Sequence, residues 1–148
     1  MKEQPAFLKP SASERFFNRL FGTLVGWGFG LPHNYLLQVV GRKTGRVYST
    51  PVNILDYKGQ RYLVAPRGET QWVRNARTSG QVWLKRGRTR QAYGLRPLPD
   101  SDKPAILKEY LDRYKTTVQR YFQIPAGSAV EAFAAVATTY PVFELIPK

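Results

Sequence analysis

Residues 35–51, with the sequence YLLQVVGRKTGRVYSTP, decide the fold prediction for this chain. An apolar run from Leu36 to Val40 leads into the polar segment Gly41–Arg46, and a second strand-like run follows from Val47 to Leu55. Two such runs joined by a short glycine-containing segment predict a β-hairpin. Glycine lets backbone N–H groups turn toward a ligand, and Arg and Lys add charge-assisted donors. We therefore expect the tip of this hairpin to bind a phosphate or carboxylate group.

The remaining pattern predicts more strands than helices. We expect strands at 35–41, 46–55, 61–66, 80–86, 89–97 and 141–146, with a turn at Lys58-Gly59 and a tight hairpin at Gly87. Thr70–Thr78 is expected to form a short helix that ends at Gly80. A longer helix is expected from about Asp100 or Asp102, either of which would cap it, with Pro104 in its first turn.

Capping boxes indicate two further helices. Ser11 and Glu14 fit a capping box before an amphipathic stretch with Phe16 on its apolar face, and Ser128 and Glu131 fit another before a short Ala-rich segment. Mostly antiparallel strands with helices at the ends predict an α+β fold around a small barrel. We expect a single domain over residues 1–148, with an N-terminal helix in 1–30, the barrel core in 31–98, and C-terminal helices and a last strand in 99–148.

Composition excludes several kinds of catalytic site. The chain has no cysteine and one histidine, so thiolate metal sites, cysteine nucleophiles and His-rich metal sites are excluded. Its ten acidic residues are scattered, which disfavours paired-carboxylate chemistry and carboxylate-only metal sites. If the chain is an enzyme, a bound organic cofactor is expected to carry the chemistry. No secretory signal is visible, which favours a cytoplasmic location.

Positive charge is concentrated in the middle of the chain. The net charge is +13, and residues 42–96 hold 13 of the 23 basic residues with only two acids, Asp56 and Glu69. Clustering of this kind indicates an anionic partner such as nucleic acid, anionic lipid or a highly charged small molecule.

Four segments in this order resemble a known family. Gly41–Arg46, Ser49–Pro51, Val64–Gly68 and Trp72–Arg77 are similar to the deazaflavin (coenzyme F420)-dependent nitroreductase family. These are flavin/deazaflavin oxidoreductases with a split β-barrel fold, of the FMN-binding, pyridoxamine-phosphate-oxidase-like kind. The resemblance implies an F420H2-dependent reductase that passes a hydride to a quinone, an activated alkene or a nitro compound. F420 carries a phosphodiester and a polyglutamate tail, so it matches the excess of positive charge.

The resemblance also implies which residues bind the cofactor. Residues of the hairpin tip would hold the phosphate, residues after the third strand would follow the ring and the start of the tail, and residues of the short helix would close over the cofactor. The implied set is Arg42, Lys43, Thr44, Gly45, Arg46, Tyr48, Pro51, Val64, Ala65, Pro66, Arg67, Gln71, Trp72, Val73, Arg74 and Asn75. Relatives can carry an arginine where this chain has Tyr48, and the sequence leaves open whether Arg46 or Tyr48 takes its place.

Alternatives remain open at this stage. Trp72 is also a plausible core residue, and Asn75 could simply cap the short helix. Tyr110 and Tyr114 are candidates to line an acceptor pocket and donate a proton, against plain packing on one helical face. The chain could instead bind FMN or heme on the same fold, or nucleic acid through its basic and aromatic residues. The N-terminal helix could touch an anionic membrane. The chain could be a monomer or a homodimer.

Overall fold

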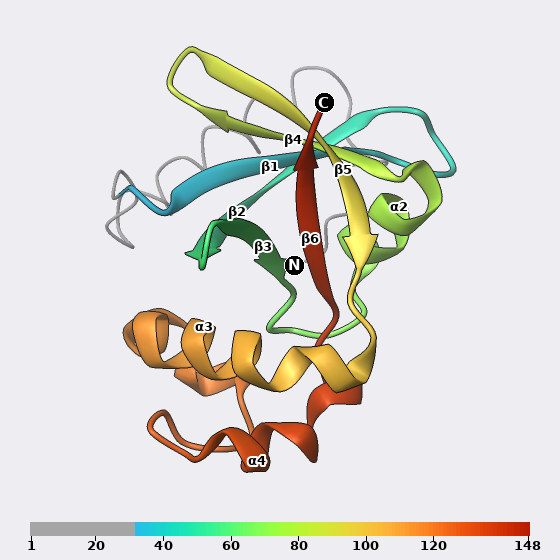
Figure 1. The fold of residues 1–148 in the computed structure, drawn as a ribbon. Coiled ribbons are helices and arrows are strands. Elements are labelled where there is room, and N and C mark those ends of the chain that lie inside the picture. Colours follow the sequence, from blue (N-terminus) through green and yellow to red (C-terminus); the bar gives the residue numbers. More distant parts are fainter. Residues whose placement is uncertain (1–31) are drawn as a thin grey trace. The chain divides into compact units, whose positions relative to one another are not determined.

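The computed structural model describes residues 32–148, and the expected N-terminal helix with its membrane contact lies outside them (Figure 1). Six strands are hydrogen-bonded in the order β1-β2-β3-β6-β5-β4, which closes a barrel. They are β1 (Asn34–Val40), β2 (Val47–Tyr57), β3 (Gln60–Val64), β4 (Gln81–Arg86), β5 (Thr89–Pro97) and β6 (Val142–Pro147). Every strand expected from the sequence is present, and the α+β barrel prediction is confirmed.

Two turns have the backbone that the sequence predicted. Lys58 and Gly59 both have positive φ, 51° and 80°, in the two-residue connection between β2 and β3. Positive φ at both positions matches the twist of the flanking strands and costs least at glycine. In the connection between β4 and β5, Gly87 is the residue with positive φ, 59°.

The chain divides into two compact units. Of the described residues, the first unit comprises 32–52, 71–95 and 147–148, and the second comprises Asn53–Thr70 and Arg96–Ile146. In the first unit, β4 pairs antiparallel with β1 and with β5. Helix α2 (Gln71–Ser79) contacts β1 and β4. It ends where Gly80 adopts φ 72° and its N–H bonds to the Ala76 carbonyl, as the sequence predicted.

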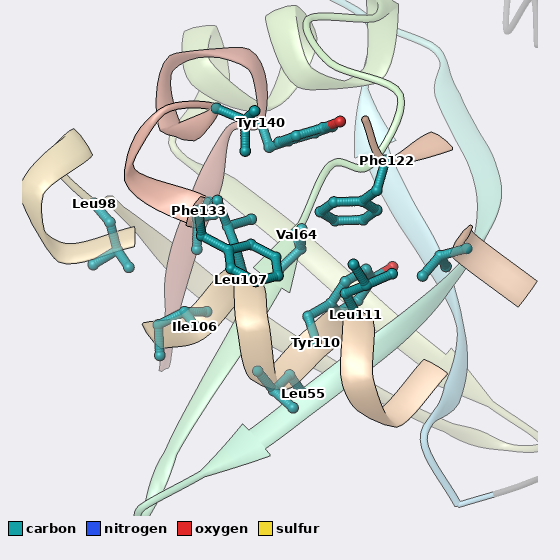
Figure 2. Close-up of a cluster of buried hydrophobic side chains, with 13 residues drawn as sticks. Leu55, Val64, Leu98, Ile106, Leu107, Tyr110, Leu111, Phe122, Phe133 and Tyr140 are labelled. Carbon is teal, nitrogen blue, oxygen red and sulfur yellow. The ribbon is translucent and has the colours of Figure 1, made fainter. Parts of the chain in front are cut away.

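The second unit is built on helices packed against strands. It contains η2 (Asp100–Asp102), α3 (Lys103–Val118), η3 (Gln119–Tyr121), α4 (Val130–Ala134) and η4 (Ala137–Thr139), and β3 pairs here with β2 and β6. Its hydrophobic cluster joins α3 residues to Phe122, Phe133 and Tyr140 (Figure 2). The apolar face of α3 is buried through Ile106, Leu107, Tyr110, Leu111 and Val118, whereas Tyr114 is partly buried and lies at a kink.

The helix caps predicted within residues 32–148 make no side-chain cap bonds. Asp102 occupies the N-cap position of α3 but makes no side-chain cap bond, and Asp100 forms an ion pair with Lys103 at 2.9 Å. The Ser128–Glu131 box does not form either, because α4 begins after Ala129 and the Ser128 hydroxyl donates to the Pro125 carbonyl. Asp and Ser bond local backbone groups in turns as readily as at helix ends, so spacing alone did not distinguish the two.

Candidate functional site

The β1–β2 hairpin tip is closed by its own backbone. The Gly41 N–H donates to the Arg46 carbonyl at 2.7 Å, and the Gly45 N–H donates to the Gly41 carbonyl at 2.9 Å. Gly45 has φ 74°, a conformation that glycine adopts without strain. The tip is therefore a fixed turn.

Tyr48 packs against Gly41 and Thr44 of the hairpin tip. Tyr48 is 6% exposed, and its hydroxyl lies 2.7 Å from the Thr44 hydroxyl, which also accepts a bond from the Arg46 N–H. A Cβ at Gly41 would lie 2.6 Å from Tyr48 Cε2, so only glycine fits above this ring. Tyr48 is thus buried beneath the tip, whereas Arg46 is exposed on it.

Arg42 ties the tip to helix α2. Its guanidinium donates to the Asn75 side-chain oxygen at 2.7 Å and to the Gln71 side-chain oxygen at 2.8 Å (through NH1 and NH2, respectively). Its backbone N–H also donates to the Asn75 oxygen, at 3.1 Å. Asn75 lies in the middle of α2 and is 3% exposed, so the alternative that it caps the helix was wrong.

These bonds occupy backbone N–H groups of the tip that were expected to face an anion. The backbone N–H groups of Gly41, Arg42, Gly45 and Arg46 all donate within the first unit, so the expectation that glycines turn them outward does not hold for these four. The side chains of Lys43 and Arg46 are exposed at the tip. An anion at the tip would therefore meet side-chain cations.

The other predicted residues of α2 differ in exposure. Val73 is fully buried, Trp72 is partly buried and Arg74 is exposed. Trp72 is therefore outside the fully buried core, which leaves part of its ring able to contact a ligand. Pro51, in the same unit, is partly buried in β2.

All charged side chains of the described first unit are cations. None is acidic, and the basic residues are Arg42, Lys43, Arg46, Arg74, Arg77, Lys85, Arg86, Arg88, Arg90 and Lys148. Neutral groups hold several of them. Arg86 lies 4.3 Å over the Tyr35 ring, and Arg90 lies 4.4 Å over the Trp83 ring. Within the unit no carboxylate side chain neutralises these charges, so its field attracts external anions.

The residues after β3 belong to the second unit. Val64 and Ala65 are buried, Pro66 is partly buried and Arg67 is exposed. The Thr70 hydroxyl in the same loop is buried without a hydrogen-bond partner in the described part of the chain. A buried hydroxyl without a partner is costly, so this loop would gain from a ligand that supplies one.

Tyr110 and Tyr114 pack against each other. Their rings meet edge to face at 5.3 Å, Tyr110 is 2% exposed, and the Tyr114 hydroxyl donates to the Ile54 carbonyl at 2.7 Å. Burial raises the pKa of both hydroxyls above 10.0, so both stay protonated at neutral pH. This arrangement favours the packing interpretation.

Residues 32–148 contain neither a candidate metal-binding cluster nor a helix that could span a membrane. No group of three or more His, Asp or Glu residues is arranged to hold a metal ion there. No helix in this part of the chain is long and apolar enough to span a membrane.

Comparison with known families decides the assignment. The model of the F420H(2)-dependent quinone reductase family matches residues 12–126. The chain belongs to this family. The F420H(2)-dependent quinone reductase assignment confirms the resemblance seen in the sequence and makes the chain an F420-dependent oxidoreductase. No protein with a curated description matches it.

Solved structures support the fold of this F420H(2)-dependent quinone reductase family member. A protein of unknown function from Agrobacterium tumefaciens has a TM-score of 0.54 at 18% identity, over 76% of this chain and 47% of its own, so the chain spans about half of that protein. An F420-H2 dependent reductase (FDR-A) has a TM-score of 0.52 at 17% identity, over 77% and 94%. A putative pyridoxamine 5'-phosphate oxidase from Listeria innocua has a TM-score of 0.53 at 13% identity, over 88% and 92%. At these identities the likeness shows the split-barrel fold alone.

The residues of the first unit fit the cofactor of this family. F420 carries a phosphodiester and a polyglutamate tail, and the described residues of the unit include ten basic side chains and no acidic one. Lys43 and Arg46 stand exposed on a turn fixed by Tyr48 and Gly41. A fixed turn with exposed cations lowers the entropic cost of binding an anion.

Proposed function

We propose that this chain is an F420H2-dependent reductase whose acceptor is a quinone, an activated alkene or a nitro compound. When bound, reduced F420 supplies a hydride from C5 of its deazaflavin ring. A quinone acceptor would gain two electrons and two protons in all and leave as a hydroquinone, while the cofactor is oxidised by two electrons. The family description favours the quinone among these acceptors.

The observation that carries the proposal is the cationic tip in a unit whose described residues include no acidic side chain. Lys43 and Arg46 would bind the phosphodiester oxygens through charge-assisted bonds. Arg42 would position the site and not contact the phosphodiester, because its guanidinium donates to Gln71 and Asn75. These bonds hold α2 against the tip. Trp72, partly buried on that helix, would offer its ring to the flat heterocycle.

Binding of F420 tests the first half of the proposal. The intrinsic fluorescence of oxidised F420 is followed as purified protein is added, for the wild type and for Lys43→Gln/Arg46→Gln. We expect the double variant to weaken binding about tenfold or more, as the loss of two exposed charge-assisted contacts predicts. The matched control is Lys85→Gln/Arg88→Gln, which removes the same charge from the β4–β5 hairpin of the same unit.

A turnover assay tests the second half of the proposal, which is hydride transfer to an acceptor. Reduced F420 is mixed with a soluble quinone, an activated alkene or a nitroaromatic, and the return of oxidised-cofactor absorbance is recorded with and without protein. Protein-dependent oxidation with at least one acceptor is the expected result. A protein that purifies yellow, binds FMN and ignores F420 at tens of micromolar would overturn the proposal.

A further inference from the structure

The Tyr48 hydroxyl has one hydrogen-bond partner in the described part of the chain. Tyr48 is 6% exposed, and its hydroxyl oxygen lies 2.7 Å from the hydroxyl oxygen of Thr44. No other described residue bonds to the Tyr48 side chain. A nearly buried hydroxyl proton that lacks an acceptor costs free energy. Tyr48 is therefore the donor of this bond, and Thr44 is its acceptor.

This donation leaves the Thr44 oxygen without further acceptor capacity. A hydroxyl oxygen carries two lone pairs and one proton. One lone pair of Thr44 accepts from Tyr48, and the other accepts from the Arg46 N–H at 3.1 Å. The proton of Thr44 remains, and no described residue accepts it. Because Thr44 is exposed, this proton points to the outside of the tip.

Close packing holds the Tyr48 ring where this bond needs it. A Cβ on Gly41 would lie 2.6 Å from Tyr48 Cε2 and 2.9 Å from Thr44 Oγ1, so the Gly41 backbone lies close to both side chains. The Gly41 N–H is bonded to the Arg46 carbonyl at 2.7 Å, and the Gly41 carbonyl accepts from the Gly45 N–H at 2.9 Å. The orientation of Thr44 is therefore set before a ligand arrives, which lowers the cost of binding.

The Thr44 hydroxyl lies next to the two exposed cations of the tip in sequence. Thr44 directly follows Lys43 and precedes Arg46 by two residues, and both of these basic side chains are exposed. The bond from the Arg46 N–H to Thr44 also ties the backbone of Arg46 to the same hydroxyl. An oriented hydroxyl beside cations suits an oxyanion, because it adds a directional hydrogen bond to their charge.

From this geometry we propose that Tyr48 is a positioning residue that directs the Thr44 hydroxyl proton to a phosphate oxygen of the bound cofactor. This inference deepens the proposed function and rests on it for the identity of the ligand. Tyr48 itself does not contact the phosphate, because it is buried beneath the tip. Of the two residues that the sequence left open, Arg46 then supplies charge, whereas Tyr48 acts through Thr44.

A double-mutant cycle tests whether Tyr48 acts through Thr44. F420 binding is measured by fluorescence titration for the wild type, Tyr48→Phe, Thr44→Val and the double variant, and for Thr44→Ser, which keeps the hydroxyl. The matched control is Tyr93→Phe, which removes the hydroxyl of another nearly buried tyrosine of the same unit, in β5. Circular dichroism and urea unfolding confirm that each variant is folded under the conditions of the titration.

Tyr48→Phe and Thr44→Val are each expected to weaken F420 binding about three- to tenfold, the range for one hydrogen bond to an anion. The double variant should bind no more weakly than Thr44→Val, because the two residues act in series. Thr44→Ser and Tyr93→Phe should bind like the wild type. The inference would be overturned by additive losses in the double variant, by unchanged binding in Tyr48→Phe, or by a loss in Thr44→Ser or Tyr93→Phe as large as that in Thr44→Val.

Inorganic phosphate separates this inference from the proposed function. Its binding to the tip is followed without F420, through the NMR shifts of the backbone amides of residues 43–46. If F420 does not bind the wild type, the proposed function fails. Saturable phosphate binding that Tyr48→Phe weakens and Tyr93→Phe does not would then still support the inference. Phosphate binding that Tyr48→Phe leaves unchanged, or no phosphate binding at the tip, would in that case overturn the inference as well.

Discussion

The two units of this chain differ in the partners of their basic side chains. The described first unit has ten basic residues and no acidic ones, whereas the second has nine basic and eight acidic residues. In the second unit, carboxylates pair with Arg61, Arg96, Lys103, Lys108 and Arg113. In the first, cations are held by neutral groups: amide oxygens hold Arg42, and aromatic rings lie beneath Arg86 and Arg90.

This difference in charge fits the proposed binding of an anionic cofactor by the first unit. An ion pair fixes a cation but cancels its field, so it serves stability. An amide oxygen or a ring fixes a cation and leaves its charge in place. The described part of the first unit therefore contributes positive charge without acidic side chains of its own, as the proposed binding of a polyanion requires. Substitutions that add a carboxylate to the first unit, or remove one from the second, test this interpretation.

Asn75→Leu should have the largest effect. It removes the acceptor of both the Arg42 N–H and the Arg42 guanidinium in a site that is 3% exposed, so we expect a loss of about 3 kcal/mol in the free energy of unfolding. Urea unfolding measures it. Gln71→Leu, which removes one bond of the same guanidinium, is the control and should cost less. Equal losses would contradict a central role for Asn75.

Glu144→Gln should be the costliest loss of an ion pair in the second unit. The Glu144 side chain is 11% exposed and accepts from Arg96 at 2.7 Å, while Arg96 is 55% exposed and can regain water. We expect a loss of about 1–2 kcal/mol. Glu109→Gln, at the more exposed pair with Arg113, should cost about 0.5 kcal/mol or less in the same assay. A Glu144 variant as mild as the Glu109 variant would show that burial adds nothing here.

Asn75→Asp makes the first unit resemble the second. The carboxylate keeps the acceptor for Arg42 but pairs with its charge, so stability should change little while F420 affinity falls about fivefold. Fluorescence titration and urea unfolding of one preparation give both numbers. Unchanged affinity would mean that the charge of Arg42 does not contribute to the field that the cofactor meets.

A pH dependence should arise from Asp112 in the second unit. Burial raises its pKa, but bonds from Lys108 and the Gly127 N–H outweigh this and hold the pKa below its ordinary value of 3.8. A carboxyl with a lowered folded pKa stabilises the protein above 3.8 and loses that contribution as pH falls through the folded pKa. Urea midpoints of the wild type and Asp112→Asn, compared from pH 5 to pH 2, should therefore converge toward the acid end. A constant difference would contradict the assignment.

Local patterns predicted most of the fold. The strand-like runs, the Lys58-Gly59 turn and the Gly80 helix end depend on side chains and backbone within a few residues, and each was found where expected. The Ser128–Glu131 capping box and the Asp100 cap did not form, because Ser128 and Asp100 had other partners within three residues. Such choices between near neighbours depend on small free-energy differences that spacing does not resolve.

The sequence by itself determined the hairpin, its glycines, the family and the one-sided charge of the segments that form the first unit. Only the tertiary structure decided how those cations are used. It showed Arg42 bound to amide oxygens 29 and 33 residues away, which leaves Lys43 and Arg46 exposed on the tip. It also brought Arg67 and Arg120 over one ring. Hydrogen bonds and cation–π contacts require approach within a few ångströms, and between residues far apart in the chain that approach is set by packing.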